Sequence, residues 1–355
     1  MNDGGELKKV LATGNDAVLK AALDAGAGMF CGYPITPSTE ILAGWAKAAD
    51  KNKNLIFIQT EDEAAAGFGA IGGILAGKKA WVATAGVGNV IMQDPLSLAE
   101  GMRIPIVVYI AQRGGPSTGT VIFSQQEVVL TRKGGNGEGL RIVYSPGNIQ
   151  ELYDYVFKAF DIAWKYYFPV FILSDGYLGK TLGEVAFHQG KAMPSHPIML
   201  NEHRAAAGHS LNLRNCYSLE EELGEVLKKQ ISDYEKMSEK VVEHEEFYVK
   251  DADLLIFAHG SVSQAAKAAI IEARAKGLRV GLFRPLTLSP FPIKESRKVV
   301  RGIKKILVVE ASLGQFSDII KSAIFGGTDA KYFEFFKPAE GITPEEILEK
   351  IEEYL

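Results

Sequence analysis

Polar side chains that can take part in chemistry stand directly after three predicted strands. TyrProIleThrPro at 33–37 follows a strand that we expect to end at about Tyr33–Ile35. GluAspGlu at 61–63 follows a second strand, and Arg113 follows a third strand within a glycine-rich loop. Because α/β sheets bind ligands at the carboxyl ends of parallel strands, the three segments are candidate binding loops.

The first segment is stiff because Pro34 and Pro37 restrict their own backbone and that of the residue before each of them. Thr36 lies between these prolines. Ser38 or Thr39 is expected to cap the helix that follows. A structural corner with a good helix cap therefore explains the segment as well as a binding loop does.

The second segment is followed by an unusual run of small residues, AlaAlaAlaGlyPheGlyAla at 64–70. Acids at a helix start usually complement the helix dipole. The small residues would also let a planar ligand lie close to the backbone. A carboxyl held in that dry place, with two acidic neighbours, would have a raised pKa and would suit a proton-sharing role.

The third segment places a guanidinium at a strand end. Arg113 can hold a carboxylate with two parallel hydrogen bonds, or it can be an ordinary solvated loop arginine.

Three other motifs favour ordinary structure. Residues 67–72 fit GxGxxG, but no strand ends at the first glycine and no acid ends the next strand, so we expect a small-residue helix. Residues 115–119 fit GxSxG, but a proline precedes Ser117 and no helix pattern follows, which favours a loop. His203 and His209 are six residues apart and give little support for a metal site.

The elements that position these segments alternate between strands and helices, which predicts an α/β fold with a largely parallel sheet. Apolar residues at helical spacing predict helices at 149–164 and at about 262–276. Short apolar runs predict the strands 55–58, 79–84, 104–110, 169–173, 254–258, 279–283 and 305–309.

We expect three parts along the chain. Residues 1–185 form the first α/β domain, 186–250 form a linker and a charged helical arm, and 251–355 form a second, smaller α/β domain.

The composition excludes several function classes. Of the 355 residues, 47% are hydrophobic and 23% are charged, and the net charge of −4 lacks the basic footprint of a nucleic-acid or anionic-membrane binder. Two cysteines, Cys31 and Cys216, cannot by themselves hold an iron–sulfur cluster or a four-cysteine zinc site. The N-terminus is polar, and charge-free stretches fall short of the roughly 18 residues that span a bilayer. These features predict a cytoplasmic protein.

Taken together, the loops resemble a known family. GlyTyrProIleThrPro (32–37), Glu63 and ArgGlyGlyProSerThrGly (113–119) are similar to the α subunit of 2-oxoacid:ferredoxin oxidoreductases, which use thiamine diphosphate. GlyAsnAspAla (14–17), LeuSerAspGly (173–176), AlaHisGlySer (258–261) and GluAlaSerLeuGlyGln (310–315) extend the resemblance over nearly the whole chain. One departure is AlaGlyValGly at 85–88, where the family usually has a SerGlyProGly-like loop.

The resemblance implies a pyrimidine-binding thiamine-diphosphate domain followed by a domain like the C-terminal domain of transketolase. Glu63 matches the glutamate that hydrogen-bonds N1′ of the aminopyrimidine and promotes proton removal from the thiazolium. Thr36 and Arg113 match residues that contact the oxo acid. The resemblance also assigns cofactor-binding positions to Tyr33, Pro34, Ile35, Gly86 and Gly88.

The resemblance further implies oxidative decarboxylation of a 2-oxo acid with coenzyme A to acyl-CoA, CO2 and reduced ferredoxin. The chain lacks a GlyAspGly segment for Mg²⁺ and the diphosphate. A β subunit is therefore expected to carry that half-site, and Mg²⁺ and the iron–sulfur clusters are expected on partner chains. Gamma and delta subunits are candidates for further partners, and neither nucleic acid nor a membrane is expected as one.

The substrate is expected to be 2-oxoglutarate, because of the RGGPSTG form of the loop, with branched-chain 2-oxoisovalerate or pyruvate as alternatives. A distal carboxylate needs a second cation, for which Arg103, Arg132 and Lys133 are the candidates near in sequence. A ferredoxin-independent thiamine enzyme and a non-catalytic scaffold subunit remain the alternative functions.

Overall fold

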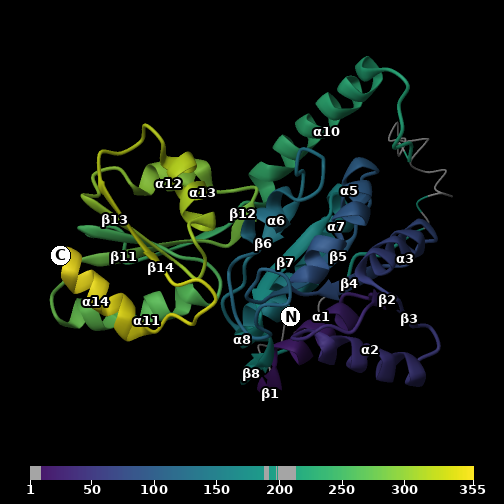
Figure 1. The fold of residues 1–355 in the computed structure, drawn as a ribbon, viewed down its shortest axis with the longest axis horizontal. Coiled ribbons are helices and arrows are strands. Elements are labelled where there is room, and N and C mark those ends of the chain that lie inside the picture. Colours follow the sequence, from purple (N-terminus) through teal and green to yellow (C-terminus); the bar gives the residue numbers. More distant parts are fainter. Residues whose placement is uncertain (1–8, 188–191, 197, 199–212) are drawn as a thin grey trace, which may run out of the picture.

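A computed structural model describes residues 9–187, 192–196, 198 and 213–355 of the chain (Figure 1). Its larger sheet has seven strands in the order β12-β6-β7-β5-β4-β2-β3. They are β2 (Met29–Gly32), β3 (Ile56–Gln59), β4 (Ala80–Thr84), β5 (Val107–Gln112), β6 (Ile142–Tyr144), β7 (Val170–Asp175) and β12 (Thr287–Ser289). All neighbouring strands are parallel except β12, which runs antiparallel to β6. The predicted α/β fold with a mostly parallel sheet is confirmed.

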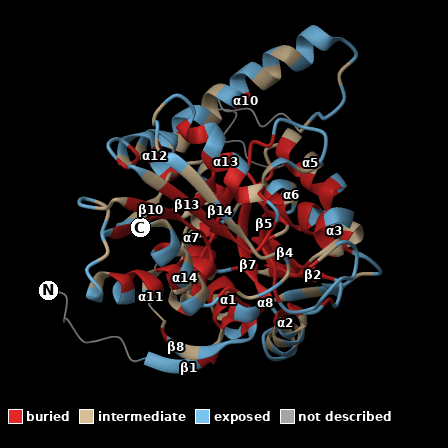
Figure 2. Cartoon of the chain, turned by 60° about the vertical axis from the view of Figure 1, so that its left-hand side comes forward, coloured by how far each residue is buried: buried red, intermediate tan, exposed pale blue. Residues whose placement is uncertain are grey.

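Helices connect and cover these strands. They are α1 (Gly14–Asp24), α2 (Thr39–Lys51), α3 (Glu63–Leu75), α4 (Val87–Ile91), α5 (Gln93–Gly101), α6 (Val128–Lys133), α7 (Ile149–Tyr166) and α8 (Gly176–Lys180). A short antiparallel ribbon of β1 (Lys9–Thr13) and β8 (Leu182–Ala186) lies beside them. The central strands β4, β5 and β7 are buried along their whole length, as parallel strands covered on both faces must be (Figure 2).

Local chemistry explains where the elements begin and end. The Asn148 side chain accepts a hydrogen bond from the Glu151 N–H at 2.9 Å and starts α7, and left-handed Tyr167 ends it. Prolines shift the bounds of two strands from those predicted. Strand β2 ends at Gly32 because Pro34 has no N–H for the ladder, and β5 begins at Val107, after the proline at 105.

The second sheet has the order β14-β13-β10-β11-β9, with only β9 antiparallel. Its strands are β9 (His244–Phe247), β10 (Leu254–Phe257), β11 (Val280–Pro285), β13 (Lys305–Glu310) and β14 (Lys331–Phe336). Its helices are α11 (Val262–Ala275), α12 (Ile293–Val299), α13 (Gln315–Ile324) and α14 (Pro344–Tyr354). Before β9 the charged segment forms α10 (Glu220–Val241), which extends above the larger sheet in Figure 1.

The two sheets are interlocked. Strand β12 follows β11 in the chain but pairs with β6 of the larger sheet, with Thr287 opposite Tyr144. In the other direction, Phe123 is buried in the core of the smaller sheet. Next to it, Gln125 accepts from the Ala311 N–H at 3.0 Å and donates to the His259 carbonyl at 3.0 Å. The segment around 123–127 is therefore fixed against the carboxyl ends of β13 and β10.

A buried ion pair adds to this junction. The Arg284 guanidinium on β11 is fully buried, and one of its nitrogens donates to Glu151 on α7 at 2.9 Å and to Glu245 on β9 at 3.3 Å. Its second terminal nitrogen donates to Glu151 and, at 3.4 Å, to the Ser145 carbonyl.

None of the helices in the described part of the chain combines the length and the hydrophobicity that a membrane span requires.

Replacing Arg284 tests this junction. Arg284→Met leaves the Glu151 carboxylate without its bidentate partner, so we expect the free energy of unfolding in urea to fall by about 3–5 kcal/mol. Lys294→Ala is the control, because Lys294 forms only an exposed pair with Glu239 and its removal should change stability by less than about 0.5 kcal/mol. Equal effects of the two substitutions would contradict a stabilising role for the buried pair.

Candidate active site

The site lies where parallel strands of the larger sheet deliver their carboxyl ends to one edge. Gly32 of β2 stands opposite Gln59 of β3, and Gln112 of β5 stands opposite Asp175 of β7. Strand β4 lies between β2 and β5 and ends at the same edge. The loops after β2, β3, β4 and β5 therefore meet, and they carry the residues that the sequence proposed.

Glu63 is the first residue of α3, where it is 3% exposed. The preceding Asp62 caps the helix by accepting from the Ala65 N–H at 2.7 Å. Burial raises the pKa of the Glu63 carboxyl, and the negative charge of Asp62 adds to this, while Arg113 opposes it. The carboxyl is thus a dry group that holds a proton more tightly than an exposed glutamate.

Gly88 lies directly against that carboxyl. A Cβ at Gly88 would stand 2.4 Å from Glu63 Oε1 and 2.1 Å from Thr84 Oγ1, so only glycine fits. The Thr84 hydroxyl is buried and has no hydrogen-bond partner in the described part of the chain. A flat glycine surface beside a carboxyl and a free hydroxyl suits a planar, nitrogen-rich ring such as an aminopyrimidine.

Arg113 lies on the neighbouring loop and is 6% exposed. Its Nη1 donates to the Thr36 carbonyl at 2.7 Å, so the guanidinium and the TyrProIleThrPro loop are joined. Its Nε is buried without a hydrogen-bond partner among the described residues. Gly86 has a φ of +53°, and a Cβ there would stand 2.6 Å from Arg113 Nε. Glycine at 86 therefore serves both the backbone conformation and the close approach of the arginine.

The structure thus brings Thr36, Glu63, Gly86, Gly88 and Arg113 together. Of the other predicted positions, Ile35 is buried, whereas Tyr33 and Pro34 are exposed on the same loop. The expected helix cap is wrong, because the Ser38 hydroxyl donates back to the Ile35 carbonyl at 3.1 Å and makes no side-chain cap on α2.

Sequence reasoning missed Glu127, which connects two of these loops. Its Oε1 accepts from the Gly86 N–H at 3.0 Å and from the Arg113 N–H at 3.2 Å. Burial raises its pKa to about 7. No spacing in the sequence indicates this role, because Glu127 reaches the site only through the fold of a 13-residue loop after Arg113.

The three cations proposed for a distal substrate carboxylate each donate a hydrogen bond to a backbone carbonyl. Arg103 donates to the Tyr167 carbonyl at 2.7 Å. Arg132 donates to the Leu288 carbonyl at 2.7 Å, and Lys133 donates to the Glu138 carbonyl at 2.9 Å.

Two of the three misleading motifs form ordinary structure, as expected. Residues 67–72 lie inside α3, and 115–119 form a loop without a strand-to-helix turn. His203 and His209 lie outside the described residues. Among those described, no group of three or more His, Cys, Asp or Glu side chains is arranged to hold a metal ion.

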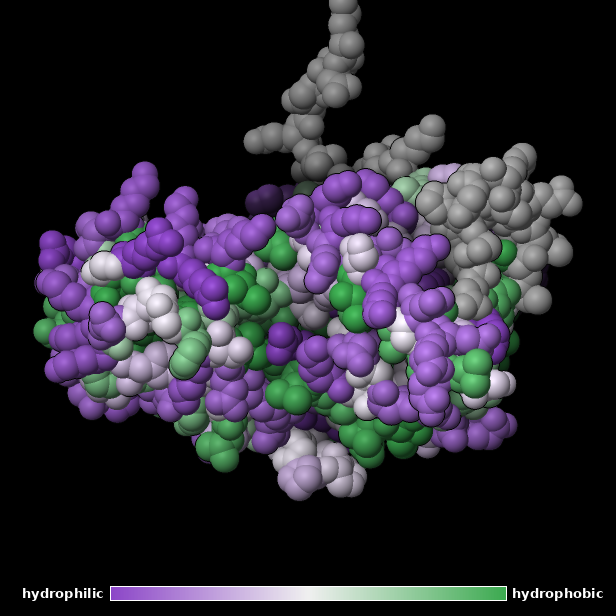
Figure 3. Space-filling model, turned by 90° about the horizontal axis from the view of Figure 1, so that it is seen from above, coloured by the Kyte–Doolittle hydropathy of each residue, from purple (hydrophilic) through white to green (hydrophobic). Residues whose placement is uncertain are grey.

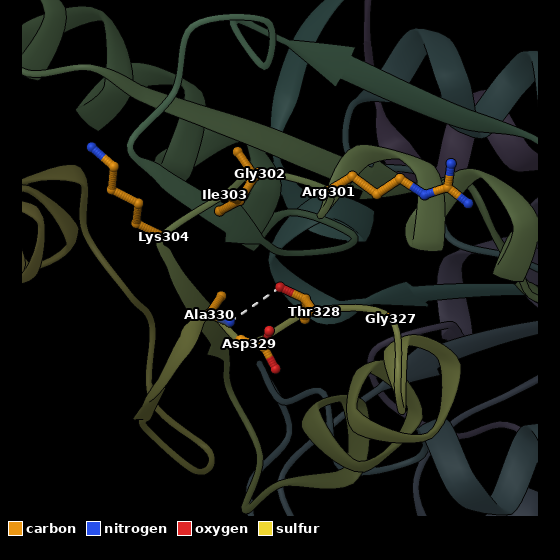
Figure 4. A pocket seen from close by; sticks show the side chains of 8 residues that line it. All are labelled: Arg301, Gly302, Ile303, Lys304, Gly327, Thr328, Asp329 and Ala330. Atoms are coloured by element: carbon orange, nitrogen blue, oxygen red, sulfur yellow. Dashed lines mark hydrogen bonds between the residues drawn. The ribbon is translucent and has the colours of Figure 1, made fainter.

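A separate pocket of about 370 Å³ lies in the smaller unit, lined by residues 301–304 and 327–330 (Figure 4). Its Thr328 hydroxyl accepts from the Ala330 N–H at 3.1 Å. None of the proposed site residues lines it.

Comparison with known proteins identifies the family of the chain. Residues 20–249 match the family model described as "Pyruvate flavodoxin/ferredoxin oxidoreductase, thiamine diP-bdg", and residues 252–347 match "Pyruvate:ferredoxin oxidoreductase core domain II". A ketoisovalerate oxidoreductase subunit, VorB, of Methanothermobacter marburgensis is 34% identical over 88% of this chain and 89% of its own length. A 2-oxoglutarate synthase subunit, KorA, of Methanocaldococcus jannaschii is 33% identical over 87% and 90%.

Solved structures give the same picture. The 2-oxoglutarate:ferredoxin oxidoreductase of Magnetococcus marinus, solved with 2-oxoglutarate, coenzyme A and succinyl-CoA bound, matches with a TM-score of 0.84 and 26% identity. The match covers 97% of this chain and 65% of that longer chain. A split-gene transketolase, at a TM-score of 0.58 and 12% identity, shares the fold alone. On this evidence the chain belongs to the family of 2-oxoacid:ferredoxin oxidoreductase α-type subunits.

Proposed function

We propose that this chain supplies the aminopyrimidine half of a thiamine diphosphate site and the contact to the carboxylate of a 2-oxo acid. The observation that carries the proposal is the buried Glu63 carboxyl, which lies against Gly88 and beside the orphaned Thr84 hydroxyl. Arg113 lies at the same edge with a free Nε. The side of the site formed by Glu63, Gly88 and Thr84 therefore suits the cofactor, and the side formed by Arg113 suits the substrate acid.

In this proposal Glu63 shares a proton with N1′ of the pyrimidine. Burial raises the pKa of its carboxyl, so the carboxyl holds the shared proton more tightly than an exposed glutamate, and the same burial excludes water from the exchange. When bound, thiamine diphosphate supplies the carbon nucleophile and the electron sink for decarboxylation. Arg113 orients the substrate by charge, while Thr36 fixes the arginine through its carbonyl.

The proposed overall reaction converts a 2-oxo acid and coenzyme A to acyl-CoA, CO2 and reduced ferredoxin. In this proposal partner chains supply the rest of the machinery. A β subunit carries the Mg²⁺ and diphosphate half of the site, and the iron–sulfur clusters also lie on partner chains. Cys31 is buried and Cys216 is exposed, and two thiols do not ligate such a cluster.

Exposed apolar side chains on α3 and α4, the helices that carry Glu63 and Gly88, support docking of the β subunit there. Phe68 on α3 is 43% exposed, and Val90 and Ile91 on α4 are 56% and 41% exposed. Figure 3 shows hydrophobic side chains at the surface in small groups among hydrophilic ones.

For the substrate we propose a 2-oxo acid with an apolar side chain, such as 2-oxoisovalerate, ahead of 2-oxoglutarate. Each of the three candidate cations for a distal carboxylate already donates to a backbone carbonyl. The loop that begins at Arg113 instead exposes Val121 and Ile122, 44% and 51%. A Cβ at Gly176 would meet both the Ile122 carbonyl and Pro37, so Ile122 borders the Thr36 loop.

Substitution of Glu63 tests the cofactor role. In the complex reconstituted with its β subunit, Glu63→Gln should lower 2-oxo-acid-dependent viologen reduction about 100- to 10,000-fold, since the amide cannot share the proton. Assembly should be unchanged. Glu61→Gln is the matched control, because Glu61 is exposed two residues away. Turnover of Glu63→Gln at the control's rate would favour a scaffold subunit instead.

Substitution of Arg113 tests the carboxylate contact. Arg113→Ala should raise the KM for the oxo acid at least about 10-fold while kcat changes less, because the lost contact is made in the ground state as well as in the transition state. Arg113→Lys keeps the charge but not the fork geometry and should give an intermediate KM. An unchanged KM in Arg113→Ala would remove the carboxylate contact from the proposal.

A substrate panel tests the side-chain preference. With the reconstituted complex, kcat/KM for 2-oxoisovalerate should exceed that for 2-oxoglutarate by about 10-fold or more, because a second carboxylate would be buried without a cation. A preference for 2-oxoglutarate would contradict the apolar assignment and would place the missing cation on a partner chain.

A further inference from the structure

A chain of buried side chains runs from Arg141 to Glu127, behind the proposed site. Arg141 Nη1 donates to Gln93 Oε1 at 2.9 Å, Gln93 Nε2 donates to Asn89 Oδ1 at 2.9 Å, and Asn89 Nδ2 donates to Glu127 Oε2 at 3.0 Å. All four side chains are at most 9% exposed. Water therefore does not compete for these hydrogen bonds.

The two ends fix the direction of the chain. A guanidinium only donates hydrogen bonds, and an ionised carboxylate only accepts them. The amides of Gln93 and Asn89 lie between and must both point their oxygens toward Arg141. Asn89 Nδ2 also donates to the Thr131 hydroxyl at 3.1 Å, so neither amide can turn over without losing bonds at both ends.

The other oxygen of Glu127 faces the site. Oε1 accepts from the Gly86 N–H at 3.0 Å and the Arg113 N–H at 3.2 Å. The Arg113 side chain lies on Gly86, since a Cβ there would come within 2.6 Å of its Nε. Glu127 Oε1 thus holds both the backbone of Arg113 and the backbone of Gly86, on which the Arg113 side chain lies.

We propose that Glu127, held by the chain Arg141–Gln93–Asn89, is a positioning residue that sets where the Arg113 guanidinium meets the substrate carboxylate. This inference rests on the proposed function of Arg113. Glu127 is 5% exposed and accepts from Gly86, Arg113 and Asn89, so in this proposal it acts through Arg113. Burial raises its pKa to about 7, and Arg113 is the charged group whose field acts on it. Three donors to the ionised form, from Gly86, Arg113 and Asn89, stabilise the carboxylate there.

Exchanging the hydrogen-bond donor at Asn89 and the acceptor at Glu127 tests the positioning role of Glu127. In Glu127→Gln the new amide hydrogens face Asn89 Nδ2, so two donors meet and the chain is broken. In Asn89→Asp two carboxylates meet. The double variant Glu127→Gln/Asn89→Asp restores one donor and one acceptor. The carboxylate introduced at position 89 accepts from the amide introduced at position 127 and still accepts from Gln93, and the Thr131 hydroxyl turns to donate to that carboxylate.

The KM for the oxo acid is measured in the reconstituted complex at about pH 8, where Glu127 is ionised. Each single variant should raise KM about 10- to 100-fold with a smaller change in kcat, and the double variant should return to within about 3-fold of the unsubstituted protein. Glu138→Gln, an exposed substitution of the same type, is the control for the amide itself. A double variant with the KM of Glu127→Gln, or one that does not fold, overturns the proposal.

Thermal unfolding of the same four variants separates this inference from the proposed function. If the complex turns over no 2-oxo acid, the proposed function fails, but the singles should still lower Tm and the double should still recover it. If Tm recovers while KM stays at the unsubstituted value in Glu127→Gln, the chain is structural only and the positioning role is overturned.

Discussion

Parallel strands place all their carboxyl ends at one edge of a sheet, and the site depends on this constraint. Four loops that lie up to 81 residues apart in the sequence, from Gly32 to Arg113, meet there because β2, β3, β4 and β5 run in one direction. The strands are buried and stiff, so the loops inherit fixed starting points. The smaller sheet then closes over the edge through Phe123 and Gln125, which hold the loop after Arg113 in place.

Charge is distributed across this edge in an unusual way. Two carboxyls, Glu63 and Glu127, and one guanidinium, Arg113, are buried here, and neither carboxyl forms a direct ion pair with the guanidinium among the bonds described. Backbone N–H groups and an amide satisfy Glu127, whereas Glu63 faces glycine. The positive charge of Arg113 therefore stays available for an incoming acid. Three neutral donors stabilise the Glu127 carboxylate in place of an ion pair with that arginine.

The sequence was sufficient for the fold class and for most strands, because strand runs are local features. Strand-end position also singled out the loops of Thr36, Glu63 and Arg113, whereas Gly86 and Gly88 came only from the resemblance to a known family. The sequence was less reliable where a proline stopped a ladder, as after Gly32, and where Ser38 bonded backward instead of capping. Glu127 and the direction of its hydrogen-bond chain were out of reach, since they depend on contacts that α4 and α5 make with Glu127, just before α6, and with Arg141, just before β6, which no local pattern records. The same holds for Arg103, Arg132 and Lys133, whose carbonyl partners are 5 to 156 positions away.

The exchange of β12 into the larger sheet has a consequence for handling the protein in pieces. An N-terminal piece that ends near residue 250 would lack β12. Its larger sheet would then have six strands instead of seven, with β6 as an open edge. That edge is apolar and fully buried in the intact chain, so a shortened chain would offer unpaired N–H and C=O groups to other copies. The smaller unit, cut from the larger one, would in turn leave Phe123's place in its core unfilled. Self-association and loss of solubility are thus the expected properties of either half, and expression of the whole chain is the way to avoid them.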